Sequence, residues 1–286
     1  MDENRPVTII KPRTGWFELN LGELTHYKDL IFLFVKRNFV SMYKQTVLGP
    51  AWAVIQPLLT TVVFSMVFGN IAGLAADGVP SFIFYLTANV LWHYFSSCLT
   101  TTSSTFIANS GILGKVYFPR LVMPISTVLS KLIDFAIQFS FMVIFVVYYT
   151  FTDSGVHPNW YVLMTPVLLL QLAMLSLGVG VIISAATTKY RDLRMLVSFG
   201  VQLWMYGTPV AYDMFSIAGF APGGRWHGLI MCNPVTPIMN IFRYGFLGIG
   251  GIDWFYYGIS WIVTLVVLFL GVVLFSRVEK TFMDTV

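Results

Sequence analysis

Three residues within otherwise apolar stretches carry side chains suited to acid–base chemistry: His93, Lys131 and Asp134. Lys131 and Asp134 are three positions apart, so on a helix their side chains share a face and can pair, or reach towards the interface. A single histidine in an apolar helix is more often a hydrogen-bonding group between helices than a catalyst. We therefore interpret all three as structural. An intramembrane transferase, which would need His93 or Asp134 for its chemistry, is an alternative.

The residue pattern offers neither nucleotide nor metal chemistry. The string nearest to a phosphate-binding loop, residues 111–116 (GILGKV), lacks the spacing of that loop and the Ser or Thr that holds Mg²⁺. The four histidines are scattered, and no His, Cys and carboxylate group has metal-ligand spacing. Proton coupling needs buried ionisable groups, which the apolar stretches almost entirely lack. We expect no catalytic residue, no metal site and no cofactor in this chain, and energy input from another subunit.

Aromatic side chains are abundant, with 25 Phe, 14 Tyr and 8 Trp. Most belong to belts at the membrane interfaces, and for any single ring lipid or core packing is the commoner role. Rings with a polar edge can also stack on the apolar faces of sugars. We expect six rings on the first and fifth membrane spans to line a transport path for a glycan. They are Trp52, Phe64, Phe68, Phe199, Trp204 and Tyr206.

The composition identifies a membrane protein. Of 286 residues, 57% are hydrophobic and only 10% are charged, whereas an average soluble domain has about 25% charged residues. A globule of this size cannot be covered with so few charges, which excludes a soluble enzyme or a nucleic-acid-binding protein. We predict a single all-α integral membrane domain over residues 1–286.

Uncharged windows predict the spans, because crossing a bilayer takes roughly 20 mostly apolar residues. We predict six transmembrane helices near residues 51–71, 81–100, 123–151, 161–186, 195–213 and 255–276. They form a six-span region, 51–276, between a cytoplasmic or interfacial arm, 1–50, and a cytoplasmic tail, 277–286.

Positive charge predicts the orientation. Fifteen of the 17 Lys and Arg residues fall on one side of this arrangement, in the arm, the tail, the loops after the second and fourth spans or, for Lys131, just inside the third span. The exceptions are Arg225 and Arg243. Loops rich in Lys and Arg stay in the cytoplasm, so both termini are predicted to be cytoplasmic.

Three further elements are expected around the spans. Residues 25–44 combine an apolar face with basic edges, which predicts an amphipathic helix at the interface; an ordinary positive flank explains the lysines equally well. Residues 100–120 predict a short cytoplasmic helix that docks a partner protein, or a linker lying on headgroups. The insertion 214–254 predicts two short helices that dip into the outer leaflet around Asn233-Pro234. Gly207-Thr208-Pro209 is expected to bend the fifth span.

Three strings resemble a known family. Residues 43–52 (YKQTVLGPAW) with Gln56-Pro57, residues 189–192 (KYRD), and Asn233-Pro234 with Pro237 and Arg243 follow in order. Together they are similar to permeases of ABC-type polysaccharide exporters, the group that exports lipid-linked O-antigen, capsule and teichoic acid chains. The resemblance covers nearly the whole chain.

The resemblance implies a homodimer that works with two copies of a separate ATP-binding subunit, which holds ATP and Mg, in a bacterial inner (plasma) membrane. It implies a coupling helix after the second span, and outer gate helices after the fifth. We expect ATPase coupling at Ile107, Asn109, Leu113, Lys115, Tyr190, Arg191 and Asp192. We expect the interface helix to attract phosphates through Lys28, Arg37 or Lys44, and the outer gate to involve Asn233, Pro234, Pro237 and Arg243. The alternatives are an ATP-independent lipid or glycolipid flippase, and an ABC permease for another substrate.

Overall fold

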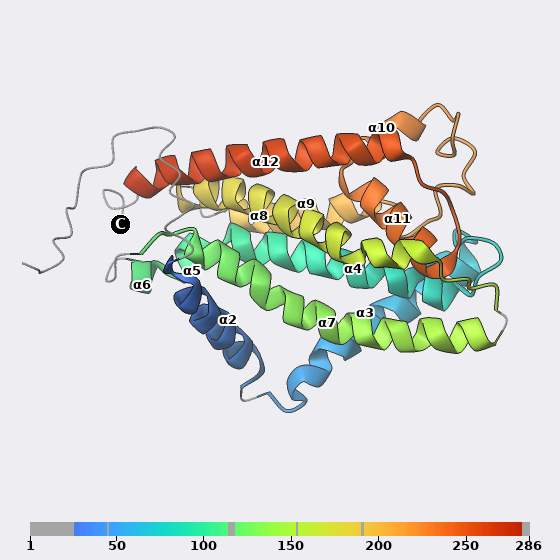
Figure 1. Ribbon diagram of the computed structural model, residues 1–286, viewed down its shortest axis with the longest axis horizontal. Coiled ribbons are helices and arrows are strands. Elements are labelled where there is room, and N and C mark those ends of the chain that lie inside the picture. Colours follow the sequence, from blue (N-terminus) through green and yellow to red (C-terminus); the bar gives the residue numbers. More distant parts are fainter. Residues whose placement is uncertain (1–25, 45, 114–117, 153, 190–191, 282–286) are drawn as a thin grey trace, which may run out of the picture.

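The computed structural model describes residues 26–44, 46–113, 118–152, 154–189 and 192–281, and all regular structure in these ranges is helical. Long helices run along the molecule, and short ones cap its two ends (Figure 1). In chain order the elements are α2 (Lys28–Tyr43), η1 (Gly49–Ala51), α3 (Trp52–Phe64), η2 (Ser65–Ile71), α4 (Ser81–Ser103), α5 (Thr105–Ala108), α6 (Ser110–Leu113), α7 (Val122–Phe151), η3 (Trp160–Met164), α8 (Thr165–Lys189), α9 (Leu193–Tyr206), α10 (His227–Met231), α11 (Val235–Leu247) and α12 (Trp254–Thr281).

Four segments of the described chain are long and apolar enough to cross a membrane. They coincide with the first, third, fourth and sixth predicted spans, so the prediction of apolar helices in those places is confirmed. Their bounds are Gly49–Ile71, Val122–Phe151, Trp160–Thr187 and Trp254–Phe275. The first combines the 3₁₀ turn η1, α3 and the π-helical segment η2.

The second predicted span, α4, is long enough but is not among those four. It packs against α3, α7 and α8, which surround it, and most of its side chains are buried. Its buried residues include the polar Thr87, Asn89 and Thr102. A helix shielded from lipid by its neighbours needs less hydrophobicity than one at the periphery, which explains why α4 has the more polar sequence.

The fifth predicted span is shorter than expected. We predicted residues 195–213 with a bend at Gly207-Thr208-Pro209, but α9 ends at Tyr206 and residues 207–213 form turns. Its 14 residues extend over about 21 Å, less than the roughly 30 Å of bilayer hydrocarbon. The expected bend is therefore the end of the helix, consistent with a proline that cannot continue the backbone hydrogen-bond ladder.

Two hydrophobic cores hold the helices together. The larger one surrounds α4, whose Tyr85, Tyr94, Phe84 and Phe95 are fully buried. The smaller one joins α2 to the neighbouring helix ends through Phe34, Phe106, Phe118, Val122, Met123, Val181 and Phe275.

Helices α8 and α12 approach each other most closely at two glycines. A Cβ added at Gly178 would lie 2.8 Å from the Leu268 backbone, and one at Gly271 would lie 2.7 Å from the Gly178 carbonyl oxygen. Both glycines are needed for this contact, because a side chain would push the helix axes apart.

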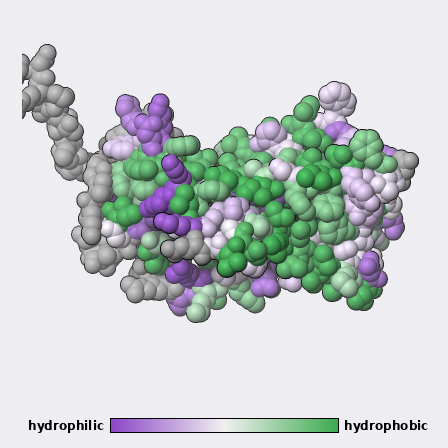
Figure 2. Space-filling view, turned by 90° about the horizontal axis from the view of Figure 1, so that it is seen from below, coloured by the Kyte–Doolittle hydropathy of each residue, from purple (hydrophilic) through white to green (hydrophobic). Residues whose placement is uncertain are grey.

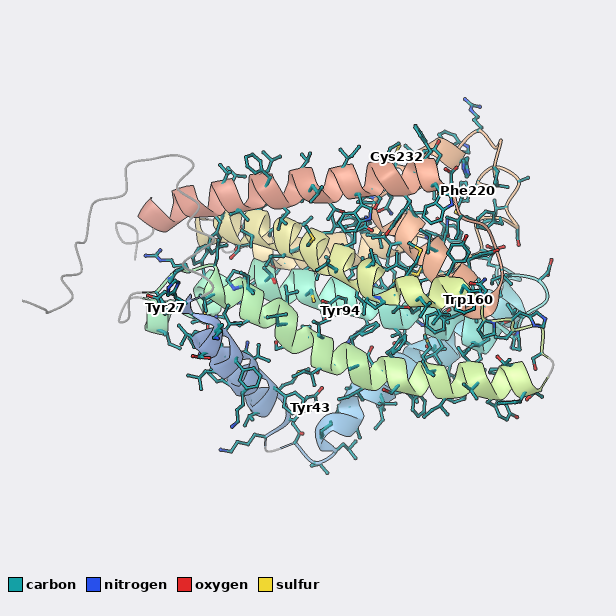
Figure 3. All side chains as sticks on the ribbon, in the orientation of Figure 1. Tyr27, Tyr43, Tyr94, Trp160, Phe220 and Cys232 are labelled. Carbon is teal, nitrogen blue, oxygen red and sulfur yellow. The ribbon has the colours of Figure 1, made fainter. Side chains whose placement is uncertain are left out.

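The molecule has two distinct ends, which the long helices connect. Tyr27 marks the end with α2, α5 and α6, and Trp160, Phe220 and Cys232 mark the other end (Figure 3). Figure 2 shows a mostly hydrophobic face along the molecule, with hydrophilic residues concentrated near the first end. We call these the α2 end and the α11 end. The expected pair of helices in 214–254 is present as α10 and α11, and their place in the membrane stays a prediction.

Candidate functional site

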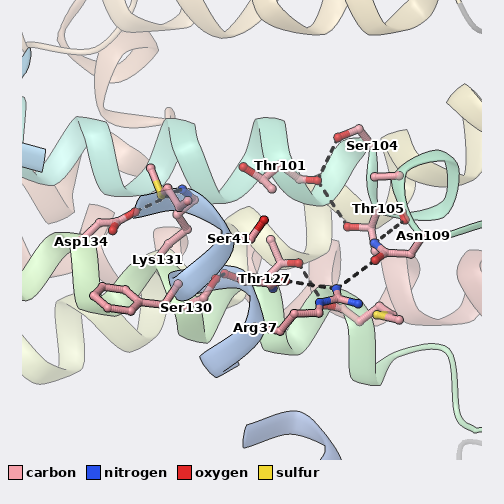
Figure 4. Close-up of a pocket in the computed structure, with 15 residues that line it drawn as sticks. Arg37, Ser41, Thr101, Ser104, Thr105, Asn109, Thr127, Ser130, Lys131 and Asp134 are labelled. Carbon is pink, nitrogen blue, oxygen red and sulfur yellow. Dashed lines mark hydrogen bonds and ion pairs between the residues drawn. The ribbon is translucent and has the colours of Figure 1, made fainter. Parts of the chain in front are cut away.

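A polar pocket of about 390 Å³ lies at the α2 end, between α2, the end of α4 with α5, and the first half of α7 (Figure 4). We call it the α2 pocket. Its lining is mainly hydroxyl and amide side chains, with three ionisable groups and a few apolar residues. The lining residues are Arg37, Asn38, Phe39, Ser41, Met42, Thr101, Ser104, Thr105, Ala108, Asn109, Met123, Thr127, Ser130, Lys131 and Asp134.

Arg37 projects from α2 towards α5. Its Nη2 donates to the side-chain oxygens of Asn109 and Asn38, each at 3.1 Å, and its guanidinium lies 4.6 Å from the centre of the Phe34 ring. Burial lowers the pKa of Arg37, but a guanidinium remains charged at neutral pH. The bond to Asn109 joins α2 to the segment expected to contact the ATPase.

Asp134 closes the opposite side of the pocket. Its Oδ1 accepts a hydrogen bond from the Tyr43 hydroxyl at 2.6 Å, and its Oδ2 pairs with the Lys131 ammonium at 3.1 Å. Burial and the contact with Asp134 raise the pKa of Tyr43 above its usual value of 10.0. Of the two alternatives that the spacing allowed, the Lys131–Asp134 pair is present. The bond from Tyr43 to Asp134 anchors the last residue of α2 to α7.

The residues expected to contact an ATPase lie partly within the described chain. Ile107 and Asn109 are half-buried beside α4, and Asp192 is exposed where α9 begins. The Thr187 hydroxyl of α8 donates to the Ser103 carbonyl of α4 at 2.8 Å, so the helix ends that lead to both expected contact segments lie side by side. Leu113 belongs to α6, with its side chain outside the description, and Lys115, Tyr190 and Arg191 lie outside the described residues. Lys28 and Lys44 are exposed on α2 and just after it, away from the pocket lining.

The expected path aromatics separate into two groups. Trp52, Phe199 and Tyr206 are exposed on α3 and α9. Phe64 is buried and its ring meets those of Phe68 and Tyr85, with centroids 5.1 Å and 6.1 Å away.

Trp204 is half-buried against Phe95, 5.2 Å between ring centroids. The rest of α9 presents an apolar face to the surroundings of the single chain. Its large exposed hydrophobic residues are Met195, Leu196, Phe199, Leu203 and Tyr206.

Asn233 joins the end of α9 to the turn before α11. Its Nδ2 donates to the Thr208 hydroxyl at 2.8 Å and to the Gly207 carbonyl at 3.2 Å. Its Oδ1 accepts from the Trp204 indole at 3.0 Å and from the Val235 backbone N–H at 3.2 Å. This one side chain therefore completes the end of one helix and the beginning of another.

Pro234 and Pro237, also expected at the outer gate, lie at this same turn. The Pro234 carbonyl accepts from Ser260 of α12 at 2.6 Å, and Ser260 in turn accepts from Gln171 of α8 at 2.8 Å. Pro237 lies in the first turn of α11, where a missing N–H costs no helical bond. The turn is thus bonded to α9 on one side and to α12 on the other.

Arg243 is buried in α11 and binds the turns that follow α9. It donates to the carbonyls of Pro209, Val210 and Tyr212, and its guanidinium carbon lies 3.8 Å from the centre of the Phe84 ring. The sequence placed this residue at the outer gate without showing its role. In the structure it is a clamp that holds residues 209–212 against α11.

Sequence reasoning missed several residues of both regions. Tyr43 entered only as part of a family string and Thr208 only as part of the expected bend. Gln171 and Ser260 were not singled out. Their common signal is a polar side chain within an apolar window, which must find a partner when it is buried. The pattern does not show which partner that is.

The long apolar helices are those of a membrane protein. Residues 29–247 match the family described as ABC-2 type transporter, and the chain belongs to that family. The chain is 27% identical over 266 residues to the O-antigen export system permease protein RfbA of Klebsiella pneumoniae. The matched region covers 93% of this chain and 96% of that protein. A second K. pneumoniae protein of that name is 26% identical over 270 residues. One from Myxococcus xanthus is 27% identical over 222 residues, covering 77% of this chain and 81% of that protein.

Proposed function

We propose that this chain is the membrane-spanning subunit of an ATP-driven exporter that moves a lipid-linked polysaccharide of the O-antigen class to the outer face of a bacterial inner membrane. The observation that carries the proposal is the similarity along nearly the whole chain to proteins named O-antigen export permeases. Membership of the ABC-2 family supports the same class.

The proposed topology has six spans and cytoplasmic termini. Helices α4 and α9 supply the second and fifth spans in addition to the four apolar segments. Shielding by α3, α7 and α8 supports the second. The turns 207–213 supply the part of the fifth span that α9 is too short to cover. Such turns can lie within the membrane because Arg243 and Asn233 bond to carbonyls of these turns inside the protein. In this orientation the α2 end faces the cytoplasm.

Two copies of the chain form the proposed path. Helices α3 and α9 are little covered by the rest of the chain, and both expose large apolar side chains. A second copy facing them would enclose a lining that includes Trp52, Phe199 and Tyr206. Such rings stack on sugars without binding one unit tightly, which suits a sliding polymer.

Two copies of a partner ATPase supply the energy in this proposal, and they hold the ATP and Mg. They contact α5 and α6, with the segment around Asp192, and the Arg37–Asn109 bond relays this movement to α2. At the other end, α10 and α11 form the outer gate.

The test is gentle purification of the tagged chain from its own cells, followed by mass spectrometry of the proteins that accompany it. We expect an ATPase with a phosphate-binding loop in near-equal amount, and ATP-dependent export when the complex is reconstituted with a lipid-linked glycan. A stable chain that moves a glycolipid without ATP would instead establish the flippase. Movement of only a drug or a simple lipid by the complex would keep the architecture and change the substrate.

A further inference from the structure

The lining of the α2 pocket carries more positive than negative charge. Its only carboxylate among the described lining residues, Asp134, has both oxygens occupied by Tyr43 and Lys131. Lys131 and Asp134 offset each other, so Arg37 leaves the lining with one net positive charge. Both bonds of Arg37 use Nη2, and its Nη1 and Nε bond to no other described residue. Three N–H groups of a planar guanidinium therefore stay available for a ligand, and such groups match the oxygens of a phosphate.

The remaining polar lining suits phosphate oxygens. Hydroxyls of Ser104, Thr105, Thr127 and Ser130 donate to carbonyls of their own helical segments at 2.7–3.3 Å. A hydroxyl in such a bond can rotate and donate to a stronger, charged acceptor instead. The pocket volume of about 390 Å³ falls within the usual range for small-ligand sites, about 300–1,000 Å³.

One edge of the pocket is apolar and open. Met42 lines the pocket and is 48% exposed, and Val40 on the same helix is 45% exposed. Phe32 and Leu33, nearer the beginning of the same helix, are also exposed apolar residues. A soluble anion gains nothing from such an edge, whereas a lipid could place its headgroup in the pocket and its chain along α2.

We propose that the α2 pocket binds the phosphoryl headgroup of the lipid that carries the substrate, with Arg37 as its main anion-binding residue. This inference rests on the proposed function. Of Lys28, Arg37 and Lys44, which the sequence offered as phosphate-attracting residues, it selects Arg37. Lys28 and Lys44 attract anionic lipid only as part of the general surface charge.

Binding would be measured by calorimetry on the purified complex with its ATPase in phosphatidylcholine nanodiscs, with the nucleotide sites saturated by ADP and Mg²⁺. Three probes separate the parts of the ligand: farnesyl diphosphate, inorganic diphosphate and farnesol. We expect farnesyl diphosphate to bind more tightly than either of the others. Equal affinity for inorganic diphosphate would reveal a site for free anions, and equal affinity for farnesol would reveal a site for the chain alone; either result overturns the proposal.

Arg37→Gln and Lys36→Gln form a matched pair, because they remove the same charge from neighbouring positions. Gln at 37 can still donate to Asn109, whereas Lys36 is exposed and outside the pocket. We expect R37Q to weaken binding of farnesyl diphosphate about tenfold or more, and K36Q to weaken it about twofold or less. Equal effects of the two variants would reduce the site to surface charge.

Thr127→Val tests the same site without changing charge or shape, should R37Q fail to assemble. We expect about three- to tenfold weaker binding of farnesyl diphosphate, and unchanged affinity would contradict the proposal. The purification and export assays described under the proposed function are separate measurements.

If the wild-type complex exports the glycan but the R37Q and T127V variants bind farnesyl diphosphate normally, the pocket is rejected and the proposed function is kept.

Discussion

The two ends of this protein join their helices in different ways. At the α11 end, Arg243 donates to three backbone carbonyls, and Asn233 donates to the Gly207 carbonyl as well as to the Thr208 hydroxyl. Backbone carbonyls have no freedom to turn away. At the α2 end, Arg37, Tyr43 and Lys131 bond to other side chains around a pocket. Side chains can exchange partners with a ligand by changing rotamer, whereas a buried carbonyl that loses its donor stays unsatisfied. From this difference we expect α9 and α11 to move as one body, and adjustment to occur at α2.

The largest expected effect is that of Arg243→Met. This variant keeps an unbranched side chain but leaves carbonyls of residues 209–212 without their donor. We expect the free energy of unfolding to fall by about 2–5 kcal/mol, measured by denaturant unfolding of the purified complex. The exposed Arg225→Met removes the same charge and serves as the control. If both variants have equal stability, Arg243 is not a clamp and the two ends do not differ as described.

Asn233→Ala is expected to have the next largest effect. It removes two donated and two accepted bonds, and it separates α9 from the α10–α11 turn. We expect a loss of about 1–3 kcal/mol in the free energy of unfolding, and faster hydrogen exchange in residues 204–208. Asn70→Ala changes an exposed asparagine and should leave both quantities unaltered. Unchanged exchange in residues 204–208 would show that α9 is held by its apolar contacts alone.

Tyr43→Phe should loosen α2 and leave the α11 end unchanged. Because one bond to a partly solvated side chain is lost, we expect about tenfold faster hydrogen exchange in α2, which corresponds to about 1.4 kcal/mol. The raised pKa of Tyr43 gives the pH dependence. The bond stabilises α2 below the unfolded pKa of 10.0 and is lost as pH rises through the higher folded value. Above pH 10, wild-type α2 should lose protection relative to Y43F; a parallel pH response of both proteins would contradict the bond.

The smallest effect on stability is expected for Trp52→Ala and Tyr206→Ala. Each side chain is 48% exposed in the single chain, so stability should change by no more than about 0.5 kcal/mol. Export should nevertheless fall severalfold with assembly intact, measured as surface glycan at matched expression. The exposed Trp160→Ala at the α11 end is the control. Normal export in both path variants would count against the aromatic lining.

The sequence predicted the first, third, fourth and sixth apolar helices well, because long uncharged apolar runs favour a membrane-crossing helix. The end of α9 was predicted wrongly for a physical reason. Pro209 alone is compatible with a bend or an end, and the choice depends on Arg243, which lies 34 positions further along the chain. A local pattern does not reveal such a contact.

The candidate sites show the same limit. The spacing of Lys131 and Asp134 predicted their pair, because partners three positions apart meet on any helix. Tyr43 reaches Asp134 across 91 positions and Asn233 reaches Thr208 across 25 positions, so neither contact follows from spacing. The sequence indicated polar groups that need partners, and the packing of α2 and α11 determined which partners they find.

The buried polar groups of α4 have a consequence for how the chain enters the membrane. Asn89 donates to Thr61 of α3, so this amide is satisfied as soon as the preceding helix is present. The Ser103 carbonyl receives its bond from Thr187 of α8, which the ribosome makes much later. As the proposed second span, α4 would leave the translocon paired with α3 and complete its contacts only after α8 has emerged. We therefore expect α4 to be kept away from bulk lipid until α8 has emerged.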